Sequence, residues 1–137
     1  MKQSVFYILL ISVFFSLVLS PSCSTTEEAP LVYDITGFWT FTCVWDFGLS
    51  ETLIFSFTGA VTNGVASDLT NGYSGIYTVN NTVVEIITNH ISPICGNIAD
   101  TFSGVFTSPT SMAGSHMRAH SGPCWIAGSM TWTATKL

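Results

Sequence analysis

Hydrophobic and polar residues alternate with a period of two along most of the sequence after Thr36. In segment 37–45 large residues stand at every second position, and the alternation resumes in segment 51–61. The large residues of these two stretches are Trp39, Phe41, Cys43, Trp45, Leu53, Phe55 and Phe57. A period of two places alternate side chains on opposite faces of a β-strand, whereas an amphipathic helix repeats every three to four residues. No window of the chain has the helical spacing, so the pattern predicts an all-β domain.

Turn-forming residues divide this alternating part of the chain into eight segments. Asn and Gly tolerate positive φ and Pro fixes the entry to a turn, so clusters of these residues favour tight hairpins. The clusters are Thr62-Asn63-Gly64, Thr70-Asn71-Gly72, Asn80-Asn81 and Ser108-Pro109-Thr110. The predicted strands are 37–45, 51–61, 65–69, 73–79, 82–88, 101–107, 111–119 and 125–135. We therefore expect an eight-stranded antiparallel up-and-down β-barrel over residues 35–137.

Up-and-down connectivity also predicts which loops lie together, because successive connections alternate between the two ends of a barrel. The connections that share one end are 46–50, 70–72, 89–100 and 120–124. The opposite end carries only tight turns. We expect the longer loops to surround an open mouth.

A spacing recurs inside the predicted strands: a large residue, any residue, Gly, any residue, and a second large residue. The glycines of the five instances are Gly59, Gly75, Gly104, Gly114 and Gly128. Because strand side chains alternate, each Gly shares a face with two bulky groups. A glycine there lets the strand coil sharply and leaves room for large neighbours, as closure of a small barrel requires.

The first and last predicted strands carry a family resemblance. Gly37-Phe38-Trp39 matches the Gly-x-Trp at the start of the first strand of the calycin superfamily, and Trp132-Thr133-Ala134-Thr135-Lys136 resembles its last strand. The chain is thus similar to the lipocalin-like and avidin-like small barrels. The resemblance implies structural roles for Gly37, Trp39 and Lys136, with the basic residue packed over the tryptophan and the barrel closed at that end. Such barrels bind small ligands, inhibit proteases or bind protein partners, so the family implies a fold and only a range of functions.

The N-terminal segment has the order of a secretory signal: Lys2, an uncharged run from Val5 to Leu19, and small residues before Cys23. The run is shorter than the about 20 apolar residues of a membrane-spanning helix. Residues 20–23 resemble a lipobox, which predicts a cleaved lipoprotein signal peptide at 1–22 and lipidation of Cys23; ordinary secretory cleavage is the alternative. Residues 23–34 then form a polar tether. We expect a bacterial lipoprotein anchored in the cell envelope, at the outer membrane or the cell surface.

The charge balance excludes several partners. The chain has 3 Lys and Arg residues against 8 Asp and Glu residues, and only 8% of its residues are charged. Nucleic acid is excluded because phosphate binding needs clustered basic residues. A polybasic membrane-binding face is excluded for the same reason. We expect a monomer that contacts the membrane only through its N-terminal lipid.

The cysteines favour one disulfide. With Cys23 acylated, Cys43, Cys95 and Cys124 remain, and an exported compartment permits one pair among them. Cys95 and Cys124 lie in loops that are predicted neighbours at the mouth, so this pair is favoured and Cys43 becomes a buried thiol. Pairing of Cys43 with Cys95 or Cys124 stays open.

Catalytic and metal-binding patterns are absent from the sequence. His116 and His120 are four residues apart, which in a strand separates them by about 13 Å. No Cys or carboxylate stands beside them at zinc-like spacing. The chain has no Gly-x-Ser-x-Gly elbow, and Asp46 and Glu51 are interpreted as capping or solvated acids. We expect no metal, no cofactor and no enzymatic activity.

Arg118 is the residue on which a ligand site would depend. The Gly spacing places Met112, His116 and Arg118 on the inner face of one strand, where a buried cation needs an anionic partner. In one interpretation Arg118 and His116 meet an anionic ligand head group. The aromatic residues that would line the rest of that site are Trp45, Phe47, Tyr73, Tyr77 and Phe106. In the other interpretation the register slips near Gly114 and Arg118 faces outward.

Two functions remain. The first is a lipid-anchored, non-enzymatic binder of a small apolar or amphipathic ligand. The alternative is a protein-interaction module, resembling a protease inhibitor or an adhesin, that uses Trp45, Phe47 and the 89–100 loop at the open end of a filled barrel.

Overall fold

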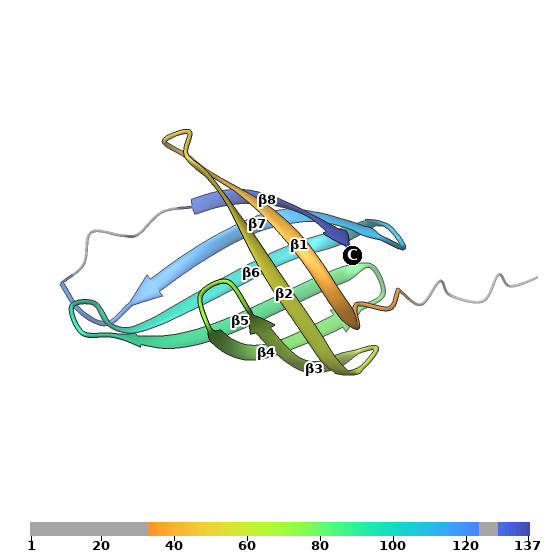
Figure 1. The fold of residues 1–137 in the computed structure, drawn as a ribbon, viewed down its shortest axis with the longest axis horizontal. Helices are drawn as coiled ribbons and strands as arrows, with labels where there is room; N and C mark the ends of the chain where they lie inside the picture. Colours follow the sequence, from red (N-terminus) through yellow and green to blue (C-terminus); the bar gives the residue numbers. More distant parts are fainter. Residues whose placement is uncertain (1–32, 124–128) are drawn as a thin grey trace, which may run out of the picture.

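The computed structural model describes residues 33–123 and 129–137, which form eight antiparallel strands in a closed barrel (Figure 1). The strands are β1 (Gly37–Trp45), β2 (Ser50–Ala60), β3 (Asn63–Asp68), β4 (Tyr73–Asn80), β5 (Val83–Ser92), β6 (Gly96–Ser108), β7 (Ser111–His120) and β8 (Ser129–Lys136). Each strand pairs with its neighbours in chain order, and β1 closes the ring by pairing with β8. This confirms the predicted all-β, up-and-down architecture.

Within the described ranges, no helix is long and apolar enough to cross a membrane. The predicted signal peptide at 1–22, the lipidated Cys23 and the tether as far as residue 32 lie outside the described residues, so these remain predictions.

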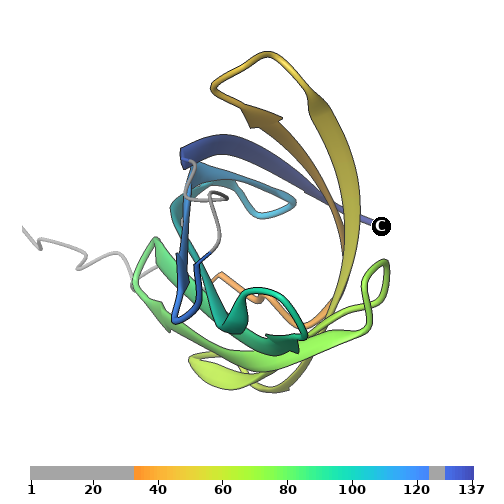
Figure 2. The same cartoon turned by 90° about the vertical axis from the view of Figure 1, so that its left-hand side faces the viewer.

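The two ends of the barrel differ as the connectivity predicts. Connections 61–62, 81–82 and 109–110 at one end are tight turns, whereas 46–49, 69–72, 93–95 and residues 121–123, which follow β7, lie at the other end. Figure 2 looks onto this second end, the mouth, and shows the β1–β2 hairpin standing apart from its neighbours.

The prediction of a long loop at 89–100 is wrong. β5 and β6 extend through this segment and pair from Asn89↔Ala99 to Ser92↔Gly96, so only a short turn joins them. The strand period in fact continues: Thr88, Ile98 and Asp100 are buried. Polar residues occupy several of the inward positions, and for that reason hydropathy alone does not reveal these strand ends.

Large side chains fill the barrel from the closed end upward. The residues at its centre are almost fully buried: Trp39, Phe41, Phe55, Phe57, Phe102, Phe106 and Trp132. Phe41 contacts Phe55 at 4.8 Å and Trp132 at 5.0 Å between ring centroids. Burial of each such ring is worth roughly 2–3 kcal/mol, so this aromatic column is the main stabilising feature of the fold.

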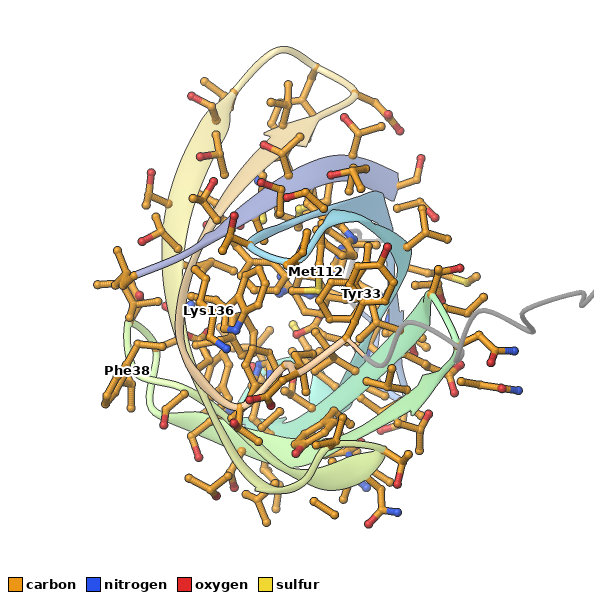
Figure 3. All side chains as sticks on the ribbon, turned by 90° about the vertical axis from the view of Figure 1, so that its right-hand side faces the viewer. Tyr33, Phe38, Met112 and Lys136 are labelled. Carbon is orange, nitrogen blue, oxygen red and sulfur yellow. The ribbon has the colours of Figure 1, made fainter. Side chains whose placement is uncertain are left out.

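The segment before β1 closes the end opposite the mouth. Trp39 donates a hydrogen bond from Nε1 to the carbonyl of Ile35 at 2.7 Å, and Ile35 is fully buried. Tyr33 stacks on Phe106 with centroids 4.8 Å apart. Figure 3 looks onto this end and shows Tyr33 inside the ring of strands, with Phe38 pointing away from it.

Lys136 packs over Trp39 at the closed end, as the family resemblance implies. Its ammonium lies 5.7 Å from the centre of the Trp39 ring and donates to the carbonyl of Asp34 at 2.9 Å. The cation–π contact and the charged hydrogen bond tie the last strand to the first.

Two of the recurring glycines make room for one indole. A Cβ added to Gly104 or Gly114 would lie 2.5 or 2.7 Å from the ring of Trp132, closer than real Cβ atoms approach. Trp132 also donates from Nε1 to the carbonyl of Ser115 at 2.9 Å. At these two positions the Gly spacing therefore has the packing role that the sequence predicts.

Cys43 is a free, buried thiol, so the alternatives that pair Cys43 with another cysteine do not occur. Burial, together with the charges of Glu51 and Asp68, raises the pKa of its thiol to about 12. Cys95 is buried beside residues 121–122, because Gly122 donates to its carbonyl at 2.8 Å. The two loops are thus neighbours, but Cys124 lies outside the described residues, and the Cys95–Cys124 disulfide stays a prediction.

Candidate functional site

A cavity of about 150 Å³ opens at the mouth, above the aromatic column. Its apolar lining consists of Trp45, Leu53, Tyr73, Phe102 and Met130. Its polar lining consists of Glu51, Asp68, Asn71, Thr88, Asp100 and Arg118. The closed half of the barrel is therefore filled by the core, and this hollow lies near the mouth.

Asp100 is the centre of the polar lining. Its carboxylate is 4% exposed and accepts hydrogen bonds from Arg118, Nε to Oδ1 at 2.6 Å and Nη2 to Oδ2 at 3.1 Å. His116 lies with Nε2 2.8 Å from the same Oδ1. Because an ionised carboxylate can only accept, Nε2 of His116 carries the hydrogen and donates it.

The network stabilises the charged forms of its members. Burial acts to raise the pKa of Asp100, but the hydrogen bonds from His116 and Arg118 outweigh it and hold that pKa below its usual range. Burial acts to lower the pKa of Arg118, and the bonds to Asp100 reverse this effect and raise it. Both groups are therefore charged at neutral pH, and their charges compensate each other.

Two histidines lie against this network. His90 stacks on Tyr73 with ring centroids 3.7 Å apart, and its Nδ1 is 3.9 Å from Oδ2 of Asp100. His116 packs against Phe102 at 4.5 Å. The Nδ1 atoms of both histidines are buried and have no hydrogen-bond partner among the described residues.

The other two carboxylates of the cavity differ in what they contact. Asp68 is buried and shapes the β3–β4 turn, because it accepts from the backbone N–H of Thr70 at 2.9 Å and from both nitrogens of Asn71. Glu51 is half-buried and makes no side-chain hydrogen bond with the described part of the chain. Glu51 is therefore the carboxylate whose oxygens are open to a ligand.

Arg118 points into the barrel, so the outward interpretation is wrong. His116 is buried and Met117 is 68% exposed, so the alternation holds through β7. The one register shift between β6 and β7 lies between Phe106 and Ser108, away from Gly114. The anionic partner of Arg118 is Asp100 of the protein itself.

The residues predicted to bind a ligand separate into four groups, and three of these lie at or beside the cavity. Trp45, Tyr73 and Arg118 line the cavity, and the guanidinium of Arg118 lies 5.7 Å from the Trp45 ring centre. His116 does not line the cavity but contacts Asp100, which does. Phe47 stacks on Trp45 at 5.7 Å and is 70% exposed, so it lies at the rim.

Tyr77 and Phe106 do not line the cavity, which corrects the prediction for both. Tyr77 donates from its hydroxyl to the carbonyl of Ala60 at 2.5 Å, and Phe106 is covered by Tyr33 at the closed end. Alternation correctly predicts that both side chains point inward. It does not give their depth along the barrel axis.

Sequence reasoning missed Asp100, Asp68, Thr88 and His90 as members of the site, and it interpreted Glu51 as a capping or solvated acid, whereas Glu51 lines the cavity. Two of them lie in the segment predicted as the 89–100 loop. A usable signal exists: the sequence Ile98-x-Asp100-x-Phe102 extends the inward alternation of β6 backward beyond Thr101.

The remaining polar candidates have local partners. Asp46 accepts from the hydroxyl of Ser129 at 2.6 Å, and Nδ1 of His120 contacts the carbonyl of Gly122 at 2.9 Å. No group of three His, Cys, Asp or Glu side chains in residues 33–123 and 129–137 has a metal-binding arrangement.

No protein-family model and no curated protein matches this sequence. Solved structures of small barrels do share its fold. EF1p2_mFAP2b bound to DFHBI superposes with a TM-score of 0.57 at 18% identity, covering 74% of this chain and 93% of that chain. The redesigned beta barrel b11L5F_LGL gives 0.58 at 15% identity and covers 74% and 90% of the two chains.

A third similar structure is the redesigned beta barrel mFAP1 bound to DFHBI, with a TM-score of 0.53, 16% identity, and coverage of 74% and 94%. The chain has the fold of a small antiparallel β-barrel. At these identities the likeness extends to the fold and not to a shared ligand.

Proposed function

We propose that this protein is a non-enzymatic binder of a small amphipathic molecule, which it holds in the cavity at the mouth. The observation that carries the proposal is the cavity itself, because aromatic and charged side chains line a hollow next to the closely packed core of the barrel. Pockets that combine apolar walls with a few convergent polar groups are typical ligand sites.

The volume limits the ligand. A cavity of about 150 Å³ matches the engineered protein cavity that accommodates benzene. A compact molecule built on one ring fits this space, whereas a long acyl chain would need the closed half of the barrel, where Phe41, Phe55 and Phe57 pack together. Two of the similar barrels are described in complex with DFHBI, which supports small-ligand binding in a barrel of this type.

We further propose that the barrel is a monomer anchored in the cell envelope, at the outer membrane, by a lipid on Cys23. Tyr33 lies at the closed end (Figure 3). An anchor that precedes Tyr33 in the chain joins the barrel on the side opposite the mouth, so the cavity would open away from the membrane. The mass of the protein isolated from its own cells tests this proposal: a diacyl or triacyl addition that is lost in Cys23→Ser supports it, and an unmodified mature mass contradicts it.

Ligand binding is tested with a fragment screen followed by NMR of the labelled protein. We expect chemical-shift changes that concentrate on residues such as Trp45 and Arg118, and a decrease of at least about tenfold in affinity for Tyr73→Ala because a wall of the cavity is lost. Ile76→Ala is the matched control, since Ile76 is on the same strand but 58% exposed on the outer face. Shifts that avoid the mouth, or equal effects of the two variants, would contradict the proposal.

A second function is favoured by exposed apolar residues at the tips of two mouth hairpins. Phe47 and Leu49 on β1–β2 are 70% and 64% exposed, and Ile91 and Ile94 on β5–β6 are 80% and 77% exposed. Exposed apolar groups of this kind mark protein contacts. Leu49→Ser with Ile94→Ser tests this function: the double variant would abolish binding of a partner protein while ligand affinity in the cavity stays unchanged.

A further inference from the structure

We propose that the ligand is a small organic cation, a primary or secondary amine attached to a single ring; this inference rests on the proposed function of the mouth cavity. It reverses the sequence-based expectation of an anionic head group at Arg118. Four observations on the cavity carry it.

The first observation is that Arg118 is already neutralised. Two of its nitrogens bond to the two oxygens of Asp100, and its guanidinium lies beside Trp45. Among the described residues that line the cavity, Arg118 is the only Lys or Arg. An anionic ligand would have to compete with Asp100 for this cation and would be placed beside that carboxylate.

The second observation is the charge that remains. Asp68 receives only neutral N–H donors, and Glu51 receives no side-chain hydrogen bond from the described chain. Three carboxylates thus face one guanidinium around the hollow, in a chain with a formal net charge of −5. A cleft lined by one sign of charge raises the local concentration of ions of the opposite sign.

The third observation is the aromatic lining. Trp45, Tyr73 and Phe102 surround the hollow together with Glu51. Aromatic rings attract ammonium groups through their negative faces, and a nearby carboxylate adds a charged hydrogen bond. A ring on the ligand would pack against the same walls, so both halves of an aromatic amine have matching surfaces.

The fourth observation is that His116 is engaged with Asp100 and not with the hollow. Its Nε2 donates to Asp100, and its Nδ1 is buried with no partner in the described chain. The ring packs on Phe102, which itself lines the cavity. The unused polar atoms on the lining are the carboxylate oxygens of Glu51, which receive no side-chain hydrogen bond from the described chain, and this favours a ligand that donates hydrogen bonds.

The test compares three probes with the same ring: 2-phenylethylamine, 2-phenylethanol and 3-phenylpropionate, titrated at neutral pH and low salt and followed by NMR shifts of the mouth residues. We expect the amine to bind at least about tenfold more tightly than the alcohol, and the carboxylate to bind more weakly than either. The preference for the amine should fall as salt is raised, because partly exposed charges are screened.

Glu51→Gln should reduce amine affinity about five- to tenfold and change alcohol affinity much less than amine affinity. Glu85→Gln is the matched control, because Glu85 makes the same charge change on the exposed outer face of β5. If the alcohol or the carboxylate binds in the mouth as tightly as the amine, the charge inference is overturned while the proposed function stands. If none of the three probes shifts the mouth residues at millimolar concentration, both proposals are overturned.

Discussion

Asp100→Asn is the most informative single change in this protein. The side chain keeps its size but loses the charge that compensates Arg118 and orients His116. Breaking a fully buried ion pair from one side costs about 3–5 kcal/mol. The side chain of Arg118 keeps 20% of its surface exposed, so water offsets part of this cost, and we expect a loss of about 2–4 kcal/mol.

A loss of about 3 kcal/mol corresponds to a melting temperature lower by roughly 12 to 24 °C for a domain of this size. Chemical denaturation of Asp100→Asn, Arg118→Met and the double variant measures the coupling between the two residues. We expect the double variant to regain much of the loss, because the uncompensated cation is then absent. Glu85→Gln, which removes one exposed carboxylate, should change the free energy of unfolding by less than about 0.5 kcal/mol.

The pH dependence of the same variants gives an independent check. The pKa of Asp100 is lowered in the folded protein, so its contribution to stability is present above the ordinary carboxyl value of about 4 and is lost as the pH falls through the lowered value. The stability difference between the wild type and Asp100→Asn should therefore shrink in acid. A difference that is independent of pH, or a double variant no more stable than Asp100→Asn, would refute the ion-pair reasoning.

Three further changes test the packing of the barrel. Gly104→Ala should cost about 1–3 kcal/mol in chemical denaturation because its Cβ meets the Trp132 ring at 2.5 Å, and a neutral result would contradict the close approach. Lys136→Met should cost about 0.5–1 kcal/mol by removing the cation over Trp39; equal stability of the two proteins would show that the contact contributes nothing. The Cys43 thiol, with its pKa raised to about 12, should resist alkylation at pH 8 until denaturant is added, and rapid labelling of the native protein would disprove its burial.

The fold could be predicted because several local signals agree. Alternation gives the strands, Asn and Gly clusters give the turns, and the Gly spacing gives the places where large side chains need room, as at Gly104 beneath Trp132. Consistency among such signals is what specifies a single fold. The arrangement of the two ends follows from connectivity alone once the strands are counted.

Depth along the barrel could not be predicted in the same way. Tyr73 and Tyr77 are four residues apart on β4 and point to the same face, yet Tyr73 lines the cavity and Tyr77 lies in the core. Period two assigns a face of the sheet and says nothing of the distance from the mouth, which depends on strand tilt and on how the neighbouring strands are staggered. For the same reason Phe106 was assigned to the site although it packs under Tyr33.

The site itself was hidden because its residues break the hydrophobic pattern. An inward charge at Asp100 and an inward His90 interrupt the alternation that identifies strands, and the sequence therefore predicts a loop at 89–100. The information was nonetheless present in the β6–β7 hairpin. Asp100 and Arg118 are equally distant in sequence from Pro109 at its turn, and the structure pairs them directly.

In a hairpin, two residues at equal distances in sequence from the turn lie opposite each other. When both positions point inward and carry opposite charges, the sequence therefore predicts a buried ion pair and not a loop. Residues directly opposite each other in an antiparallel pair have Cβ atoms within about 5.5 Å, and opposite charges at such positions stabilise the strand pairing. In this chain Asp100 and Arg118 are at equal distances from Pro109. Pairing them extends β6 back at least to Asp100 and gives Arg118 a partner within the protein. The charge left over at the mouth is then that of Glu51 and Asp68, and for this reason the internal pair bears directly on which ligand the cavity can accept.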